Sequence, residues 1–388
     1  MKYKLGILFG SLVMTSLSAN AQNSVTLYGI IDVGVNMITN AGGHHQYAMT
    51  SGVNNGSRWG LLGTEDLGGG LKALFRLENG FDATSGTLGQ GGRMFGRQAW
   101  VGLGSNYGTV TLGRQYDSLV DAVGNLSVAS QWGGYVSAHP GDLDNYNNTY
   151  RINNSVKYTS PKFGGIVFSG LYSFGGVAGD TSRSQIWSVG ARYSSGPLTA
   201  GVGYLNARNP NLSLFGSNAS SVAATTASST SPVYSGYLSA HSYQSIGTGL
   251  QYVYGPATFG LTYSNVKFMA LGDTSSGPNP NRYSGTATFN NAEVNFNYFV
   301  TPDFQVGAAY QYTDGDGGSN NPGAKYHQGE AVLNYFFSKR TTVYLLGVYQ
   351  HASGTDSRNQ PAVAAINLLT PSTSSNQTFV RVGLRTKF

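Results

Sequence analysis

The stretch FVRVGLRTKF, residues 379–388, has the alternation of a β-strand that separates two different environments. Successive side chains of a strand point to opposite faces of the sheet. One face of this stretch is apolar except for Thr386, and the other carries Arg381, Arg385 and Lys387. We therefore expect a wall strand with an apolar medium on one side and water on the other.

The N-terminus is typical of a secretory signal peptide. Lys2 and Lys4 precede an apolar run, and Ala19 and Ala21 form a small-x-small cleavage motif. We predict cleavage after Ala21, so that residues 1–21 are removed. The remaining chain, residues 22–388, is then expected to form a single domain.

The composition excludes several classes of protein. Only 10% of the residues are charged and no long apolar run follows the N-terminus, so neither a disordered chain nor a helical membrane protein fits. The chain has no cysteine, which excludes disulfides, thiol nucleophiles and thiolate metal sites. The formal charge of +6 falls to +4 without Lys2 and Lys4, because residues 1–21 hold no acidic residue. This scattered excess is too weak to indicate nucleic-acid binding.

Short and long connections alternate between segments that show period-two hydrophobicity. Gly, Pro, Ser and Asp, which tight turns require, mark seven short connections. These short connections lie at residues 66–70, 105–108, 160–165, 194–197, 254–256, 301–303 and 338–340. Eight long polar connections lie at residues 40–55, 81–91, 115–150, 176–184, 207–240, 270–285, 313–325 and 352–375. The chain is thereby divided into sixteen strands.

This rhythm predicts an all-β fold, a 16-stranded antiparallel transmembrane β-barrel. An even number of strands with short turns at one end and long loops at the other is what an outer-membrane barrel requires, because lipid leaves no partner for an open sheet edge. Aromatic residues such as Tyr158 and Phe163 flank the short turns and predict a girdle at one membrane interface. The last strand then closes the barrel against SVTLYGIIDVGV, residues 24–35, with its charges toward the lumen.

Several motifs resemble one known family. They are SVTLYGIIDVGV, SRWGLLGTEDLGGGLKALFRLENGFD from residue 57, FGRQAWVGLGSNYGTVTLGRQYD from residue 95, RINNSVKYTSP from residue 151, and the terminal Phe388. Together they resemble the Gram-negative general porins, in particular the trimeric porins of β-proteobacteria. The resemblance spans the chain after the signal peptide and is weaker in the loops.

The resemblance implies a homotrimer in the outer membrane of a Gram-negative bacterium, in contact with lipid and lipopolysaccharide. Each barrel would be a water-filled pore for passive diffusion of small hydrophilic solutes and ions, narrowed by a third loop that folds inward. Phe388 would be the assembly signal read by the barrel-assembly machinery. Neither a cofactor nor a metal is implied, and we expect no enzymatic activity.

The expected constriction has a basic and an acidic side. Alternation turns Arg58 away from Trp59 and Arg97 away from Trp100, so that both arginines face the lumen. On the basic wall the candidate residues are Arg58, Arg76, Arg97, Arg114 and Arg151. The resemblance implies that three of them, Arg58, Arg114 and Arg151, form the basic side of the constriction. The third loop, residues 115–150, offers Asp117 and Asp121, with Asp142 and Asp144 further along.

Arg114 is difficult to place. It shares the parity of Val110 and Leu112, which should face lipid, unless a bulge or the departure of the third loop reverses it. Guanidinium groups stay charged and have a fixed geometry, so a row of them facing carboxylates would produce a transverse field and a mild preference for anions. Alternatively, these arginines are ordinary lumen charges that salt screens.

Three other functions stay open. A substrate-specific channel for sugars or organic acids would line its lumen with aromatic residues, and the candidates are Tyr28, Tyr116, Tyr135 and Tyr146. An enzymatic barrel would need a Ser or Asp converging with His241, His327 or His351. A structural or adhesive barrel would keep the third loop outside the pore. We expect the remaining loop histidines, such as His139, to be solvated.

Overall fold

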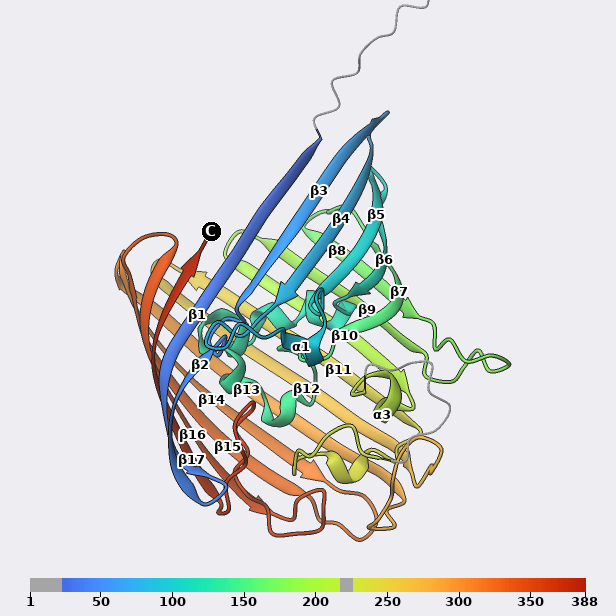
Figure 1. Ribbon diagram of the computed structural model, residues 1–388, viewed down its shortest axis with the longest axis vertical. Coiled ribbons are helices and arrows are strands. Elements are labelled where there is room, and N and C mark those ends of the chain that lie inside the picture. Colours follow the sequence, from blue (N-terminus) through green and yellow to red (C-terminus); the bar gives the residue numbers. More distant parts are fainter. Residues whose placement is uncertain (1–22, 217–225) are drawn as a thin grey trace, which may run out of the picture.

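The computed structural model describes residues 23–216 and 226–388, so the predicted signal peptide and residues 217–225 lie outside the described part. The strands form one antiparallel sheet that closes on itself (Figure 1). The first strand, β1 (Ser24–Ala41), pairs with the last, β17 (Asn376–Lys387), and Val33 lies opposite Leu384. The predicted closure of the barrel by its first and last strands is confirmed.

The barrel wall has sixteen positions, although seventeen strands form it. Both β2 (His44–Ser51) and β3 (Arg58–Gly68) pair with the same edge of β1, β2 along its second half and β3 along its first half. They are therefore two parts of one wall strand, interrupted at residues 52–57. The 16-stranded barrel predicted from the sequence is confirmed.

The remaining strands follow in chain order around the ring. They are β4 (Leu71–Gly80), β5 (Gln98–Ser105), β6 (Gly108–Gln115), β7 (Ile152–Thr159), β8 (Ile166–Ser173), β9 (Ile186–Ser195), β10 (Leu198–Arg208), β11 (Ser242–Tyr254), β12 (Ala257–Leu271), β13 (Gly285–Thr301), β14 (Phe304–Asp316), β15 (Ala324–Phe336) and β16 (Thr341–Gly354). The seven short turns lie where the sequence predicts them. The prediction of a first long loop at residues 40–55 is wrong. Gly42 and Gly43, both with positive φ, make a tight turn there, and β2 follows at once.

Side chains alternate across the wall as expected. On β17, Val382 and Leu384 are 55% and 51% exposed on the outer face, whereas Arg381 is completely buried on the inner face. On β13, Val294 is exposed outward and Glu293 is buried inward. The outer face is thus apolar and the inner face polar, as a membrane barrel requires.

A cluster on the inner face joins the two ends of the chain. The Arg381 guanidinium lies 3.1 Å from the Asp32 carboxylate and donates to Tyr344 Oη on the neighbouring strand. It also donates to the Thr50 side chain of β2, so that it reaches across β1. Gly34 makes this possible, because a Cβ there would lie 2.7 Å from the guanidinium carbon. Buried polar contacts therefore link four neighbouring strands at the point of closure.

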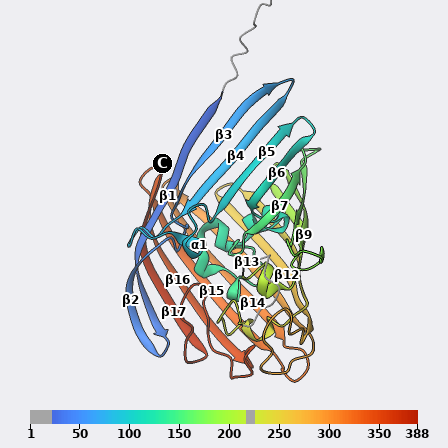
Figure 2. The same cartoon turned by 45° about the vertical axis from the view of Figure 1, so that its right-hand side comes forward.

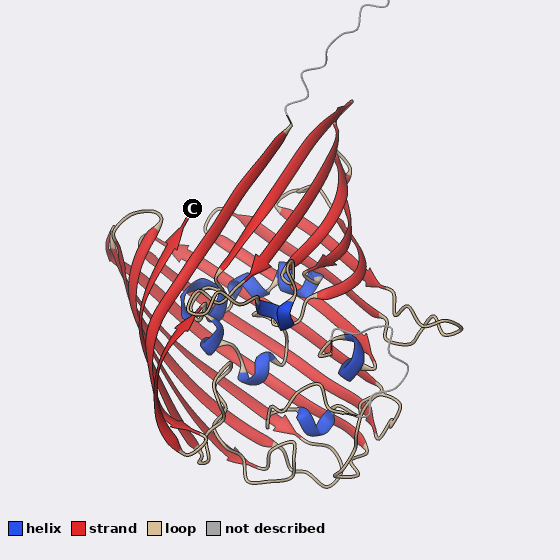
Figure 3. Ribbon diagram, in the orientation of Figure 1, coloured by secondary structure: helices blue, strands red, loops and turns tan. Residues whose placement is uncertain are grey.

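The third loop, residues 116–151, folds into the barrel and is not part of the wall (Figures 1 and 2). It forms short helical turns, which Figure 3 shows in blue within the ring of red strands. These are α2 (Ser118–Ala122), η1 (Gly124–Leu126), η2 (Ala129–Gly133), η3 (Tyr135–Ser137) and η4 (Pro140–Asp142). The inward-folded third loop implied by the resemblance is confirmed.

Elsewhere the helices are single turns in other loops: α1 (Gly89–Gly92), α3 (Pro210–Ser213) and η5 (Ser235–Tyr237). Within residues 23–216 and 226–388, no helix has the length and apolar character needed to span a membrane.

Glycines of the wall allow the third loop to pack closely. A Cβ at Gly190 of β9 would lie 2.3 Å from the Ser118 carbonyl oxygen, and one at Gly201 of β10 would lie 2.1 Å from that of Ala122. Both distances are far below van der Waals contact, so any larger residue would displace α2. These glycines fix how far the loop lies from this side of the wall.

Candidate functional site

A cavity of about 230 Å³ lies between the third loop and a wall side made of residues 54–56, the start of β3 and Arg97. Its charged and aromatic lining includes Arg58, Arg97, Arg151, Tyr116, Asp121 and Tyr135. A second cavity of about 330 Å³ adjoins it, between the second, third and eighth loops. Gly56, Arg97, Tyr135 and Arg151 line both, so these four residues mark the junction of the two spaces.

Arg97 has the most hydrogen bonds of the three cavity arginines. Its Nε donates to Glu78 Oε1 at 2.7 Å, and its two terminal nitrogens donate to Tyr135 Oη at 3.0 Å and Tyr116 Oη at 3.1 Å. The guanidinium is therefore fixed between a wall carboxylate and two phenols of the third loop. Trp100, however, faces the lumen and donates to Gln98, so our alternation argument for Arg97 is wrong. Arg97 reaches the cavity because it precedes β5.

Arg58 and Arg151 complete the cationic side. Arg58 lies 4.0 Å from Glu78 and keeps 27% of its side chain exposed. Arg151 lies over the Tyr116 ring at 5.9 Å and donates to the Thr149 carbonyl oxygen at 3.1 Å. The structure brings these two predicted residues together with Arg97 around one cavity.

Two other predicted arginines are held apart from it. Arg76 lies over the Tyr28 ring at 5.3 Å, beside the first cavity and outside its lining. Arg114 pairs with Ala99 across the sheet and donates to the carbonyl oxygens of Gly96 and Arg151. The bulge we considered is present, because the register to β7 shifts between Gly113 and Gln115. Even so, Arg114 lines neither cavity.

The acidic residues of the third loop have different roles. Asp121 lines the first cavity and forms an ion pair with Lys157 of β7. Asp117 is completely buried and caps α2, where its carboxylate accepts from the backbone of Leu119 and Val120. Burial raises the pKa of Asp117 to about 6. The structure therefore places one of the two predicted carboxylates in the cavity and the other in a helix cap.

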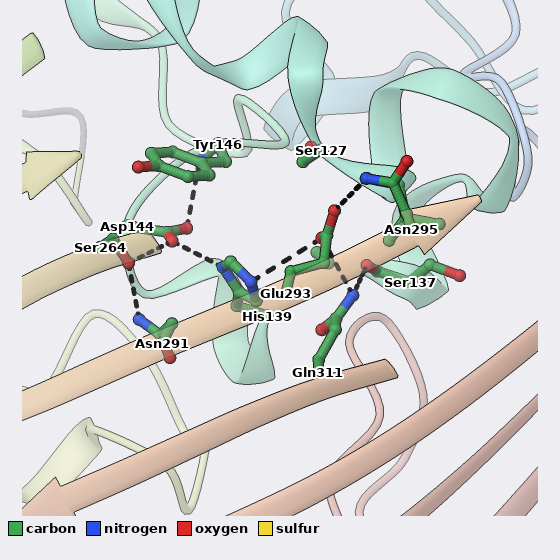
Figure 4. Close-up of polar contacts among 12 residues, drawn as sticks. Ser127, Ser137, His139, Asp144, Tyr146, Ser264, Asn291, Glu293, Asn295 and Gln311 are labelled. Atoms are coloured by element: carbon green, nitrogen blue, oxygen red, sulfur yellow. Dashed lines mark hydrogen bonds and ion pairs between the residues drawn. The ribbon is translucent and has the colours of Figure 1, made fainter. Parts of the chain in front are cut away.

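Polar contacts anchor the third loop to the opposite wall, on β12 to β14 (Figure 4). His139 Nδ1 lies 2.6 Å from Asp144 Oδ2 within the loop, and its Nε2 lies 3.8 Å from Glu293 of β13. Glu293 accepts from the Val128 backbone at 2.8 Å, and Ser264 of β12 donates to Asp144 at 2.6 Å. The loop is thus held on two sides of the barrel.

The expectation that His139 is solvated is wrong. Its side chain is buried, and although burial alone would lower the pKa of His139, the Asp144 and Glu293 carboxylates raise it to about 9. The imidazole is therefore protonated at neutral pH and forms ion pairs. No local sequence signal identifies this contact, because it depends on the path of a loop between residues far apart in sequence.

The histidines of the enzymatic alternative do not converge. His241 pairs with Asp273 at 2.8 Å between two loops. His327 and His351 lie opposite each other on β15 and β16, on the outward-facing parity. Among the residues that the structure describes, no group of three or more His, Cys, Asp or Glu side chains could hold a metal ion.

Three of the four predicted lumen tyrosines do share the cavity. Tyr116, Tyr135 and Tyr146 all line it, together with the arginines. Tyr28 is separate and donates to Glu78 at 2.8 Å. Three tyrosines beside the arginines fit a binding site for a particular solute as well as a channel that selects ions by charge alone.

The protein is a closed antiparallel barrel that is apolar outside and polar inside. A loop narrows its lumen against a row of arginines. These features define the class of constricted outer-membrane β-barrels. The chain belongs to the Gram-negative porin family, whose profile matches residues 10–356. This is a family of channels rather than of enzymes, and its members lie in the outer membrane.

Individual relatives agree with this assignment. The chain is 38% identical to an outer membrane porin protein of Bordetella pertussis over 50% of this chain and 57% of that protein. It is 36% identical to outer membrane porin protein 32 of Delftia acidovorans over the same shares. It is 30% identical to major outer membrane protein P.IB of Neisseria gonorrhoeae over 48% of this chain and 52% of that protein. The matches thus span little more than half of these relatives.

Solved structures share the fold over nearly the whole chain. An anion-selective porin from Comamonas acidovorans superposes with a TM-score of 0.73 at 24% identity, covering 94% of this chain and all of that one. The trimer form of OmpT of Vibrio cholerae superposes with a TM-score of 0.63 at 16% identity, covering 94% of this chain and 99% of that one.

Proposed function

We propose that the protein is a channel through which small hydrophilic solutes and ions diffuse passively across the outer membrane, with a mild preference for anions. The observation that carries this proposal is the first cavity, which lies between the third loop and the wall and is lined by three arginines. Solutes that cross the barrel on this side must pass a space lined by fixed, charged side chains. The proposal includes no catalytic step.

The charges around the cavity support the preference for anions. Three arginines line it against a single aspartate, and that aspartate already has Lys157 as a partner. Glu78 offsets part of the positive charge, but it does not line the cavity. A passing anion therefore meets an excess of cationic donors, and water and salt screen this excess only in part. The anion-selective porin from Comamonas acidovorans has the same fold.

Ion selectivity in a planar bilayer tests the proposal. Purified protein should form large, nearly ohmic channels, and the reversal potential under a KCl gradient should favour chloride. Arg151→Glu reverses one charge in the lining and should shift the chloride-to-potassium permeability ratio by about ten-fold, since each unit charge contributes up to about 1 kcal/mol at 4 Å in water.

Arg340→Glu is the matched control, because it makes the same change of net charge in an exposed turn at the barrel end. Its permeability ratio should remain that of the wild type. If Arg151→Glu behaved like Arg340→Glu, the assignment of the constriction would be wrong. Failure to form any open channel would reject the function itself.

A substrate-specific channel is the second candidate, and the three cavity tyrosines favour it. Aromatic rings beside charged groups can hold a sugar or an organic acid by stacking and hydrogen bonds. Such a site would saturate, so a particular solute would block the ionic current at low concentration. Current that falls only in proportion to solute viscosity would favour general diffusion.

We further propose that the barrel works as a homotrimer in contact with outer-membrane lipid and lipopolysaccharide. Aromatic side chains gather at membrane interfaces, and exposed rings such as Phe168, Trp187 and Tyr252 lie on β8 to β11. On β5 and β6 the exposed large apolar side chains are aliphatic, for example Val101 and Leu103. This sector has the character of a surface that other subunits cover.

Export and assembly complete the proposal. The signal peptide, residues 1–21, would direct export, and residues 22–388 would form one domain. Phe388 exchanges backbone hydrogen bonds with Gly29 at 3.0 and 3.1 Å, and its ring occupies the space that a Gly29 Cβ would need. This position at the point of closure supports a role for Phe388 as the signal read by the barrel-assembly machinery.

A further inference from the structure

Tyr135 of the third loop occupies the junction of the two cavities. Its hydroxyl accepts a hydrogen bond from Arg97 at 3.0 Å, and Tyr135 lines both spaces together with Arg97 and Arg151. The backbone around it is fixed from two directions. Its N–H donates to the Val53 carbonyl oxygen at 2.9 Å, and its carbonyl oxygen accepts from Asn367 of the eighth loop.

The surroundings leave this ring little freedom to move. A Cβ at Gly56 would lie 2.7 Å from Tyr135 Oη, so the phenol touches the backbone of the wall segment opposite. The preceding residue, Gly134, has a φ of +72°, and a Cβ there would lie 2.4 Å from the Asn54 Cα. The hydroxyl is therefore held at a defined place in front of the arginines.

Cations surround this hydroxyl, and the nearby carboxylates already have partners. The charged groups around the junction are Arg58, Arg97 and Arg151, with Asp82, Asp121 and Glu78 as the acidic ones. Asp121 is bound by Lys157 and Glu78 by Arg97, while the residues of the eighth loop at this place are uncharged. Asp121 lines only the first cavity, so at the junction of the two cavities the third loop presents the phenol of Tyr135 and no carboxylate.

We propose that Tyr135 is the residue of the third loop that determines ion specificity, because the ionisation of its hydroxyl sets how much of the arginines' charge acts on a passing anion. This inference rests on the proposed channel function. In the neutral form the phenol adds no negative charge, so only Glu78 and Asp121 offset the three arginines. When its O–H bond breaks and the proton leaves to water, the phenolate adds one negative charge beside Arg97 and weakens the preference for anions.

The electrostatic surroundings agree with this geometry. Burial alone would raise the pKa of Tyr135, but Arg97 and Arg151 lower it to about 7. The preference for anions should therefore be strongest below pH 7 and should weaken as the pH rises through 7. A channel with an aspartate at this place would show no such change in the same range.

The test compares reversal potentials of wild type and Tyr135→Phe in planar bilayers between about pH 5.5 and pH 8.5, a range that brackets the lowered pKa. In the wild type the chloride-to-potassium permeability ratio should fall by about two- to five-fold, the size expected for one unit charge a few ångströms away in water. Tyr135→Phe should lack the part of this fall that comes from the phenolate. Other groups also titrate here, such as His139 and Asp142, but both variants keep them, so the difference isolates Tyr135.

Tyr116→Phe is the matched control, since Tyr116 also accepts from Arg97 but lines only the first cavity. It should retain the pH dependence. Tyrosinate absorbance provides a second readout that needs no channel. The titration of wild type minus that of Tyr135→Phe should show one group ionising near pH 7.

The outcomes separate the two proposals. Equal pH profiles in wild type and Tyr135→Phe, with Arg151→Glu still altering selectivity, would reject the role of Tyr135 and leave the channel function intact. A difference titration without a group near pH 7 would also reject it. Absence of anion preference in every variant would instead reject the proposed function.

Discussion

Arg381 shows how a charged residue is tolerated on the inner wall. It has no exposed surface, yet its guanidinium has an ion pair to Asp32 and hydrogen bonds to Tyr344, Asn36 and Thr50. Removing one partner of such a pair leaves the other charge uncompensated in a low-dielectric setting. The Asp32 carboxylate therefore compensates the buried charge of Arg381 where the barrel closes.

Asp32→Asn keeps the shape of the side chain and removes its charge. We expect it to reduce the free energy of unfolding by about 3–5 kcal/mol, the usual cost of breaking a buried ion pair. Urea unfolding of the barrel in lipid vesicles measures this. Asp314→Asn is the matched control, because Asp314 pairs with Lys325 at 3.2 Å while both side chains stay about half exposed. An equal loss in the two variants would show that burial does not strengthen the first pair.

Single residues differ in how well the sequence predicts them. Arg58 and Arg151 could be placed near the lumen because strand alternation or the resemblance specifies them directly. Asp117 and His139 could not, because a helix cap and a buried ion pair depend on the three-dimensional path of the third loop. Arg97 reached the expected place for a different reason, since it lies just before β5 and is not subject to strand alternation.

At the scale of elements, α2 is positioned by the wall it lies against. Gly190 and Gly201 are on neighbouring strands, and each leaves space for a backbone carbonyl oxygen of this helix. The contact involves backbone on both sides, so it cannot relax through a change of rotamer. The width of the lumen on the side of the arginines therefore depends on residues that lie outside the cavity.

Gly190→Ala tests this dependence. The added Cβ would lie 2.3 Å from the Ser118 carbonyl oxygen, so α2 must shift away from β9 and toward the arginines. We expect a lower single-channel conductance and a destabilisation of about 1–3 kcal/mol, as overpacking typically causes. Gly347→Ala on β16 is the control, because nothing lies within 4 Å of a Cβ there. Unchanged conductance in both variants would contradict the role of the wall glycines.

Strands and turns were the most predictable elements. Period-two alternation and turn residues are local signals, and β13, β14 and β17 lie where these signals predict them. The first loop was predicted wrongly, because the alternation in residues 44–51 is short: only Tyr47 and Met49 are large apolar residues there, and both are exposed. The pairing of β2 with β1 follows from the turn at Gly42 and Gly43, a two-residue hairpin signal that the prediction did not use.

At the scale of the whole molecule, the outer surface is not uniform. Exposed aromatic residues extend over the sector from β7 to β16, from Tyr158 to Tyr349, whereas the exposed large apolar side chains of β5 and β6 are aliphatic. A barrel surrounded only by lipid would carry interfacial rings on all sides. The difference gives the proposed trimer a definite orientation, with β5 and β6 toward the neighbouring subunits.

Spin labels can test this orientation cleanly, because the chain contains no cysteine of its own. A label at Val101→Cys on β5 should be shielded from oxygen dissolved in the lipid, since another subunit covers it. A label at Leu333→Cys on β15 should be strongly accessible, because Leu333 is 44% exposed on the opposite wall. Equal accessibility at both positions would contradict a trimer that uses this face.

The interruption between β2 and β3 has a consequence for engineering the pore. Residues 52–57 leave the wall and contact the third loop, where Asn54 donates to the Trp132 carbonyl oxygen at 2.6 Å. The opening is therefore bounded by two segments of independent length, the long third loop and the short segment 52–57 from within a wall strand. Shortening the second would widen the passage while the sequence of the third loop stays intact, so aperture and loop chemistry become separately adjustable.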